Sequence, residues 1–397
     1  MKHSSGGSSR PTQVDTGAFQ TSRVLTITGA HAVHDTYTAF LPPLLPVLIS
    51  KLAISNTEAG ALTVFLQAPS VLQPYIGYLA DRITLRYFVI LAPAVTAIMM
   101  SLIGIVPTYA ALALLLLVVG FSSAAFHAVA PVLAGRLSGL NLGRGMGLWM
   151  VGGELGRTLG PLVIVASVSF LTLEGTPWLI TVGLLASVVL YLLFKDIQAR
   201  PAAALEPISF GQALRALRPL LLPLVGIVTA RVFVLASLTT YLPIFLTDEG
   251  ASLWLAGVSL TVLEAAGVIG ALAGGSLSDR LGRRVVLFAA MLSTPILMFL
   301  FLSVDGWPRL PLLLALGFTS LSAAPVMMAL VQETFPENRA MANGLYMALS
   351  FVIRSGAIVV LGAVGDLIGL RTAFAVSATV PLLGLPLLLL LPRRSLG

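Results

Sequence analysis

Long apolar runs are the feature of this 397-residue sequence that most restricts its fold. Hydrophobic residues make up 57% of the chain and charged residues only 10%, whereas soluble domains carry about a quarter charged residues. Each run holds about twenty residues, enough for a helix to cross about 30 Å of hydrocarbon, while a β-barrel would show shorter alternating segments. We predict an all-α integral membrane protein whose twelve transmembrane helices lie near 24–49, 58–80, 87–106, 110–135, 145–171, 177–194, 219–246, 253–277, 285–303, 309–332, 341–366 and 371–391.

One long polar break divides these segments into two sets of six. It predicts an N-terminal six-helix bundle over 23–194, a cytoplasmic linker over 195–218 and a C-terminal six-helix bundle over 219–397. The first part of the chain, 1–22, is polar and rich in Gly and Ser, without the apolar core of a signal peptide. We expect it to form a disordered cytoplasmic tail.

The distribution of basic residues predicts the orientation. If the N-terminus is cytoplasmic, only Lys51, Arg309 and Arg371 of the 23 Lys and Arg residues lie in loops on the outer side. We therefore expect a multi-pass protein of the inner (plasma) membrane with both termini cytoplasmic. The formal charge of +7 is scattered over the loops without a basic face, so the lipid bilayer and not nucleic acid is the expected partner. We expect a monomer.

A short motif recurs in the turn after the second helix of each half. Glycine permits a tight turn there, and aspartate and arginine can pair or cap helix ends. The positions are Gly77, Asp81 and Arg82 in the first half, and Gly275, Asp279, Arg280, Gly282 and Arg283 in the second. Repeated six-helix halves imply a pseudo-twofold transporter whose site lies near the middle of the membrane between the halves.

The fifth predicted helix carries a stripe of small residues. Gly152, Gly156 and Gly160 are spaced by four and follow Gly147, and such a stripe allows close helix packing. Pro161 removes one backbone hydrogen bond and predicts a kink.

Nine ionisable residues fall inside the apolar segments, where they are costly and normally retained for function. They are His31, His34, Asp35, His127, Glu154, Arg157, Arg231, Glu264 and Arg354. The spacing of His31, His34 and Asp35 places them close together on one helix. Counting along the helices puts the charges of both halves at one depth. We expect Glu264 to pair with Arg231 or Arg354.

These residue types suit coupling between protons and an anion. A carboxyl group in a low-dielectric site can exchange protons near neutral pH, and histidine titrates there without help. The predicted proton-coupling residues are Asp35, His31, His34, Glu154 and Glu264. Guanidinium suits phosphate, phosphonate or carboxylate, so the predicted substrate-binding residues are Arg157, Arg231, Arg354 and His127. Structural interpretations stay open: Glu154 and Arg157 can neutralise each other, Arg354 can anchor to backbone carbonyls, and His127 can be a packed histidine.

The repeated loop motif closely resembles the signature of the major facilitator superfamily. There the loop latches the cytoplasmic side of the outward-open state, which implies a conformational role for Asp81 and Asp279. The first copy departs from the pattern, with Thr84 where Gly is usual. The stripe in the fifth helix resembles the signature of the superfamily's antiporters, but Ile164 and Val165 replace its trailing glycine pair. Antiport and plain packing both remain open for this helix.

Three stretches, 31–46, 73–82 and 120–127, are similar to the fosmidomycin-resistance group of proton-coupled exporters, although that group has Asn where His34 stands. The resemblance implies a proton-coupled antiporter that exports a small anionic or amphipathic drug or metabolite by alternating access. A proton symporter of a metabolite anion, or a lipid flippase or membrane assembly factor on the same fold, are the alternatives. No nucleophile–base motif or recognisable metal-ligand spacing is present, so we expect no enzyme, cofactor or metal.

Overall fold

The computed structural model describes residues 18–73, 75–76, 86–196, 210–334 and 339–391. These residues form helices and short connections, with no strand among them, which confirms the all-α prediction. Ten helices in this part of the chain are long and apolar enough to cross a membrane. The predicted span 24–49 is divided between two consecutive helices. The predicted span 58–80 begins as a helix and then runs into residues outside the described part.

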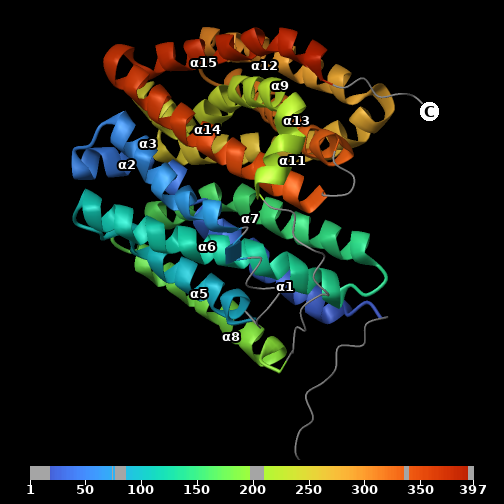
Figure 1. The fold of residues 1–397 in the computed structure, drawn as a ribbon. Coiled ribbons are helices and arrows are strands. Elements are labelled where there is room, and N and C mark those ends of the chain that lie inside the picture. The colour runs from blue at the N-terminus through green and yellow to red at the C-terminus, as the bar shows by residue number, and fades with distance from the viewer. Residues whose placement is uncertain (1–17, 74, 77–85, 197–209, 335–338, 392–397) are drawn as a thin grey trace, which may run out of the picture.

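The N-terminal half lies below the C-terminal half in Figure 1. Its helices are α1 (Thr21–Thr38), α2 (Leu41–Leu52), α3 (Asn56–Gln67), α5 (Arg86–Ser101), α6 (Tyr109–Leu137), α7 (Leu142–Leu171) and α8 (Ile180–Phe194). Short 3₁₀ segments extend α3 (Ala68–Leu72) and α5 (Leu102–Gly104) and precede α8 (Thr176–Leu179).

The C-terminal half contains α9 (Phe210–Ala236), α10 (Leu242–Asp248), α11 (Leu253–Leu281), α12 (Arg283–Ser303), α13 (Arg309–Thr334), α14 (Arg339–Ile368) and α15 (Leu370–Gly384), which continues as a 3₁₀ segment (Leu385–Leu390). The helix α9 begins at Phe210, inside the range predicted as linker. Hydropathy locates the apolar span, which is Leu222–Asp248 in the described part, and the helix itself continues through the polar residues before that span.

The first helix of each half is interrupted at a corresponding place. Between α1 and α2 the helix breaks just before Pro42 and Pro43, which occupy the first turn of α2. Between α9 and α10 a π-helical segment, Ser237–Tyr241, precedes Pro243. Proline is tolerated in a first turn because its missing N–H would be unpaired there anyway.

The two halves pack together at the end of the molecule that holds the α2–α3 turn, where α3 lies against α14 (Figure 1). The Asp366 carboxylate accepts hydrogen bonds from the backbone N–H groups of Asn56, at 2.7 Å, and Thr57, at 2.9 Å. Gly60 permits this approach, since a Cβ there would lie 2.0 Å from the Tyr241 hydroxyl. The halves are therefore closed against each other at this end.

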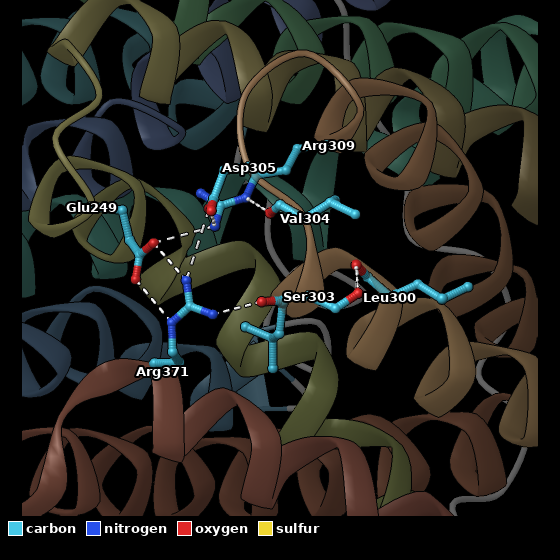
Figure 2. Close-up of polar contacts among 8 residues, drawn as sticks. Glu249, Leu300, Ser303, Val304, Asp305, Arg309 and Arg371 are labelled. Carbon is cyan, nitrogen blue, oxygen red and sulfur yellow. Dashed lines mark hydrogen bonds and ion pairs between the residues drawn. The ribbon is translucent and has the colours of Figure 1, made fainter.

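Ion pairs join three connections of the C-terminal half (Figure 2). Arg371 lies 2.7 Å from Glu249, and Arg309 lies 2.7 Å from Asp305 and 3.2 Å from Glu249. Hydrogen bonds and charge from Arg371, helped by Arg309, lower the pKa of Glu249 below its ordinary value of 4.5.

In the N-terminal half, Lys51 donates to the Gly104 carbonyl at 2.5 Å. All three basic residues predicted for the outer loops thus make structural contacts.

Candidate functional site

His31 and Asp35 of α1 meet His127 of α6, and we call these three residues the histidine–aspartate triad. The two histidine Nε2 atoms lie 3.2 Å apart. His31 Nε2 lies 3.3 Å from Asp35 Oδ2, and His127 Nε2 lies 3.4 Å from Asp35 Oδ1. Both α1 residues are buried. The proximity of His31 and Asp35 agrees with their spacing, whereas His127 was predicted to serve the substrate.

Backbone carbonyls hold the outer nitrogen of both histidine rings. The Nδ1 of His31 lies 2.9 Å from the Trp149 carbonyl oxygen, and the Nδ1 of His127 lies 2.9 Å from that of Ser123. A carbonyl only accepts hydrogen bonds, so each Nδ1 carries a hydrogen, and each ring when neutral presents a lone pair at Nε2. With both rings neutral, two imidazole lone pairs and a carboxylate face one another.

Aromatic side chains surround the triad on α6 and α7. The Trp149 ring stacks on His31 with 3.7 Å between centroids. Phe126 stacks on His34 at 4.5 Å, and neither nitrogen of the fully buried His34 finds a hydrogen-bond partner of good geometry. His34 therefore packs beside the triad and is not one of its members, in contrast to the grouping expected from spacing. Trp149 and Phe126 were not singled out in the sequence because apolar aromatics are common in such helices.

The glycine stripe of α7 lies directly against α1. A Cβ at Gly152 would lie 2.5 Å from the Thr28 carbonyl oxygen, and one at Gly156 would lie 2.5 Å from that of Ala32. At Gly160 the Cβ would lie 2.5 Å from Ala39 Cβ. The stripe therefore allows the close helix packing that the sequence predicted.

Gly153, next to this stripe, makes room for the triad itself. A Cβ there would lie 2.5 Å from His31 Cε1 and 3.2 Å from Asp35 Oδ2. Gly147, by contrast, has open space where a Cβ would be. Pro161 lies inside α7. Gly153 was missed because the four-residue period of the motif skips it.

A second group of charges lies between the halves. Glu154 and Arg157 of α7 form an ion pair. Glu264 lies on α11, which packs against α7, and the charges of Arg157, Glu154 and Arg354 all act on it. Arg354 of α14 donates to the Thr239 hydroxyl at 2.9 Å. Four of the predicted residues thus form one group of charges that is drawn from both halves of the molecule.

Arg231 lies elsewhere, in a pocket within the C-terminal half. It shares this pocket with Thr294 of α12, Thr319 and Ser320 of α13, and Pro381 of α15. Among the described residues it makes no ion pair, so it is not the partner of Glu264 that the sequence suggested. Counting residues along the helix predicts how deep Arg231 lies in the membrane, but not which side of α9 carries it.

The loop motif can be followed only in its second copy, because Gly77, Asp81 and Arg82 lie outside the described residues. Gly275, Asp279 and Arg280 belong to the last turns of α11, and Gly282 has φ +94°, a conformation that favours glycine. Arg283 opens α12 and pairs with Asp279 at 2.7 Å and Glu333 of α13 at 2.8 Å. Glu333 was missed, since nothing near it in the sequence links it to the motif.

Comparisons of the sequence with known proteins identify its family. The sequence matches the profile of the Major Facilitator Superfamily over residues 27–350 and 261–396, so the chain belongs to this superfamily of membrane transporters. It is 25% identical over 396 residues to the fosmidomycin resistance protein of Escherichia coli K12, covering 95% of this chain and 96% of the relative. It is also 25% identical to the uncharacterized transporter YfnC of Bacillus subtilis, covering 93% and 92%.

Solved structures confirm the fold. A bacterial homologue of the human lysosomal transporter Spinster, inward-facing and occupied, superposes with TM-score 0.77 at 14% identity, covering 94% of this chain and 96% of that one. A D-xylose–proton symporter gives TM-score 0.72 at 15% identity, covering 96% and 99%. The predicted major facilitator fold is therefore confirmed, and the chain is a multi-pass membrane transporter and not an enzyme.

Proposed function

We propose that this transporter is a proton-driven antiporter that exports a small anionic or amphipathic compound by alternating access. The observation that carries the proposal is the position of Arg157, which pairs with Glu154 on α7, the helix that packs against the Glu264-bearing α11 of the other half. Groups shared by both halves are the ones whose contacts change when the halves move. The similarity to a fosmidomycin resistance protein supports efflux.

Arg157 and Arg354 are the substrate-binding residues in this proposal. The Nε of each is buried and has no hydrogen-bond partner among the described residues. Such unused guanidinium donors are suited to a carboxylate, phosphate or phosphonate. Arg231 and His127, which the sequence assigned to the substrate, lie in other surroundings.

Antiport requires proton and substrate to exclude each other. A substrate that donates hydrogen bonds to Glu154 and Glu264 meets this condition, because protonation removes the acceptor charge that it needs. The exported compound therefore carries donor groups beside its anionic group. We assign coupling to these two acids, since they adjoin the arginines. The coupling role predicted for Asp35, His31 and His34 stays a prediction.

The Glu154–Arg157 ion pair also favours a second function, proton symport of a plain anion. Protonating Glu154 would free Arg157 and strengthen the binding of an anion that makes no contact with the acids. The two functions thus predict opposite effects of pH on substrate affinity.

Thermal stabilisation of the purified protein at pH 6 and pH 8 distinguishes them, with fosmidomycin as the first compound tested. Antiport predicts the larger stabilisation at pH 8, and symport the larger at pH 6. For antiport, Glu264→Gln should weaken the pH dependence, whereas for symport, which depends on Glu154, it should leave the pH dependence intact. Glu174→Gln, in the turn after α7, should leave it unchanged in either case. A substrate affinity independent of pH in the wild type would contradict both functions.

The proposal includes a monomer in the inner membrane with both termini cytoplasmic, as the basic residues predict. The end closed by α3 and α14 is then the outer end. A lipid flippase or assembly factor is not favoured by any contact among the described residues.

A further inference from the structure

We propose that the histidine–aspartate triad binds one divalent transition-metal ion of the zinc class. The ligands are His31 Nε2, His127 Nε2 and one carboxylate oxygen of Asp35, atoms that all lie within 4.8 Å of one another. This inference does not rest on the proposed transport function. It also departs from the expectation of no metal, which considered ligand spacing within single segments and not pairs of helices.

The distances fit a metal better than direct hydrogen bonds. In a tetrahedral zinc site with bonds of about 2.0–2.1 Å, neighbouring ligand atoms lie about 3.3 Å apart. The three separations in the triad are 3.2, 3.3 and 3.4 Å. A charge-assisted hydrogen bond between histidine and carboxylate would be about 2.7–2.9 Å, and none of the three is that short. A single central cation accounts for all three separations together.

The groups around the ligands are those that a metal site requires. Metal-binding histidines almost always donate their other ring N–H to a carbonyl or carboxylate, which fixes the ring and its tautomer. Here the carbonyl oxygens of Trp149 and Ser123 accept these hydrogen bonds, each at 2.9 Å from Nδ1. The Asp35 Oδ1 is buried and makes no hydrogen bond of good geometry. With both rings neutral, the buried Asp35 carboxylate has no positive charge beside it, and a metal ion supplies one.

The ligand set also indicates the type of ion and its access. Two imidazoles and one carboxylate suit Zn²⁺, Co²⁺ or Ni²⁺, whereas Mg²⁺ and Ca²⁺ prefer oxygen ligands. The His127 side chain is 30% exposed, against 5% for His31 and 10% for Asp35, so an ion enters from the His127 side. Three protein ligands leave a fourth position open. A dication on one carboxylate keeps a net positive charge, so this position favours an anion.

Titration calorimetry on the full-length, chelator-treated protein in detergent tests the site, with Zn²⁺ alone as the probe. We expect one zinc ion per chain in the wild type and at least a tenfold loss of affinity in His127→Ala. His127→Cys keeps a zinc-binding atom and should bind zinc more tightly than His127→Ala, which a merely structural role would not produce. His34→Asn removes a neighbouring histidine that is no ligand and should bind within threefold of the wild type.

Cobalt gives a second readout, because Co²⁺ in a four-coordinate site absorbs strongly in the visible range. The wild type and His34→Asn should show this absorption, and His31→Ala should not. Thermal unfolding without metal identifies any variant that fails to fold, and the remaining variants then decide. The inference is overturned if the wild type binds no zinc, or if His34→Asn loses binding as completely as His127→Ala. In that case the triad holds a proton only.

Discussion

At the scale of single residues, the contact between α1 and α7 depends on positions that carry no side chain. Gly156 brings the two backbones together, and Gly153 leaves the space that the His31 ring occupies. Both glycines therefore position the triad without taking part in its chemistry. The stripe resembles an antiporter signature, but each contact that it makes here is a packing contact.

We predict that Gly156→Ala destabilises the protein by about 1–3 kcal/mol, because its methyl group would overlap the Ala32 carbonyl in a filled interface. Gly147→Ala in the same helix is the matched control, since a Cβ there meets nothing within 4 Å. It should be neutral or stabilising by up to about 1 kcal/mol, as expected for replacing glycine in a helix. Thermal unfolding in detergent measures both, and equal effects would contradict the packing argument.

A second prediction concerns Glu249, whose pKa is lowered by Arg371 and Arg309. A carboxyl group with a lowered pKa in the folded state adds stability above its unfolded pKa, near 4.5, and loses it as pH falls through the folded value. Glu249→Gln should therefore cost about 1 kcal/mol at pH 7, and the difference from wild type should shrink as the pH falls below 4.5 and through the lowered pKa of Glu249. Unfolding curves of both proteins across this range test it. A difference that grows at low pH would be evidence against the ion pairs.

The residues of the site differ in how far the sequence predicts them. His31 and Asp35 could be brought together because i,i+4 spacing on one helix fixes their relation. His127 and Trp149 could not, since they lie on α6 and α7 and their distance from α1 depends on helix packing. The surroundings of Arg231 could not be predicted for the related reason that depth in the membrane does not say which side of the helix carries the residue.

At the scale of helices, hydropathy predicts where the spans lie but not how they are interrupted or joined. The break between α1 and α2 and the π-helical segment before α10 are set by local backbone geometry near prolines, which leaves the apolar pattern unchanged. The contact of α3 with α14 is likewise invisible in either helix alone. It rests on the Asp366 carboxylate at the start of α3, where helix N–H groups favour a negative charge.

A disulfide across this contact should stop transport if the two halves must separate there. The chain has no cysteine, so Asn56→Cys with Gly365→Cys introduces one defined pair. A Cβ at Gly365 would lie 3.7 Å from the Asn56 Nδ2, an atom two bonds from the Asn56 Cβ, so the two positions are neighbours, and gel mobility verifies that the disulfide has formed before transport is measured. Oxidation should abolish efflux and reduction restore it, whereas each single-cysteine variant should be unaffected. Efflux that persists in the oxidised pair would show that this end need not open.

At the scale of the whole molecule, the charges divide into two groups with different surroundings. The triad is enclosed by the N-terminal half, whereas Glu154, Arg157, Glu264 and Arg354 come from both halves. In the proposed mechanism only the second group would change its contacts as the halves move, which is why we assign the coupling to it. Whether protons move against the substrate or with it then depends on whether the substrate contacts the two glutamates or only the two arginines.

Proton movement in proteoliposomes tests this claim most directly. A pH-sensitive dye inside the vesicles would record protons while a fosmidomycin gradient drives transport through wild type, Glu264→Gln and the control Glu174→Gln. The account predicts protons moving opposite to the substrate in the wild type and control, and at least a tenfold smaller proton flux in Glu264→Gln. Protons moving with the substrate, or an undiminished flux in Glu264→Gln, would contradict it.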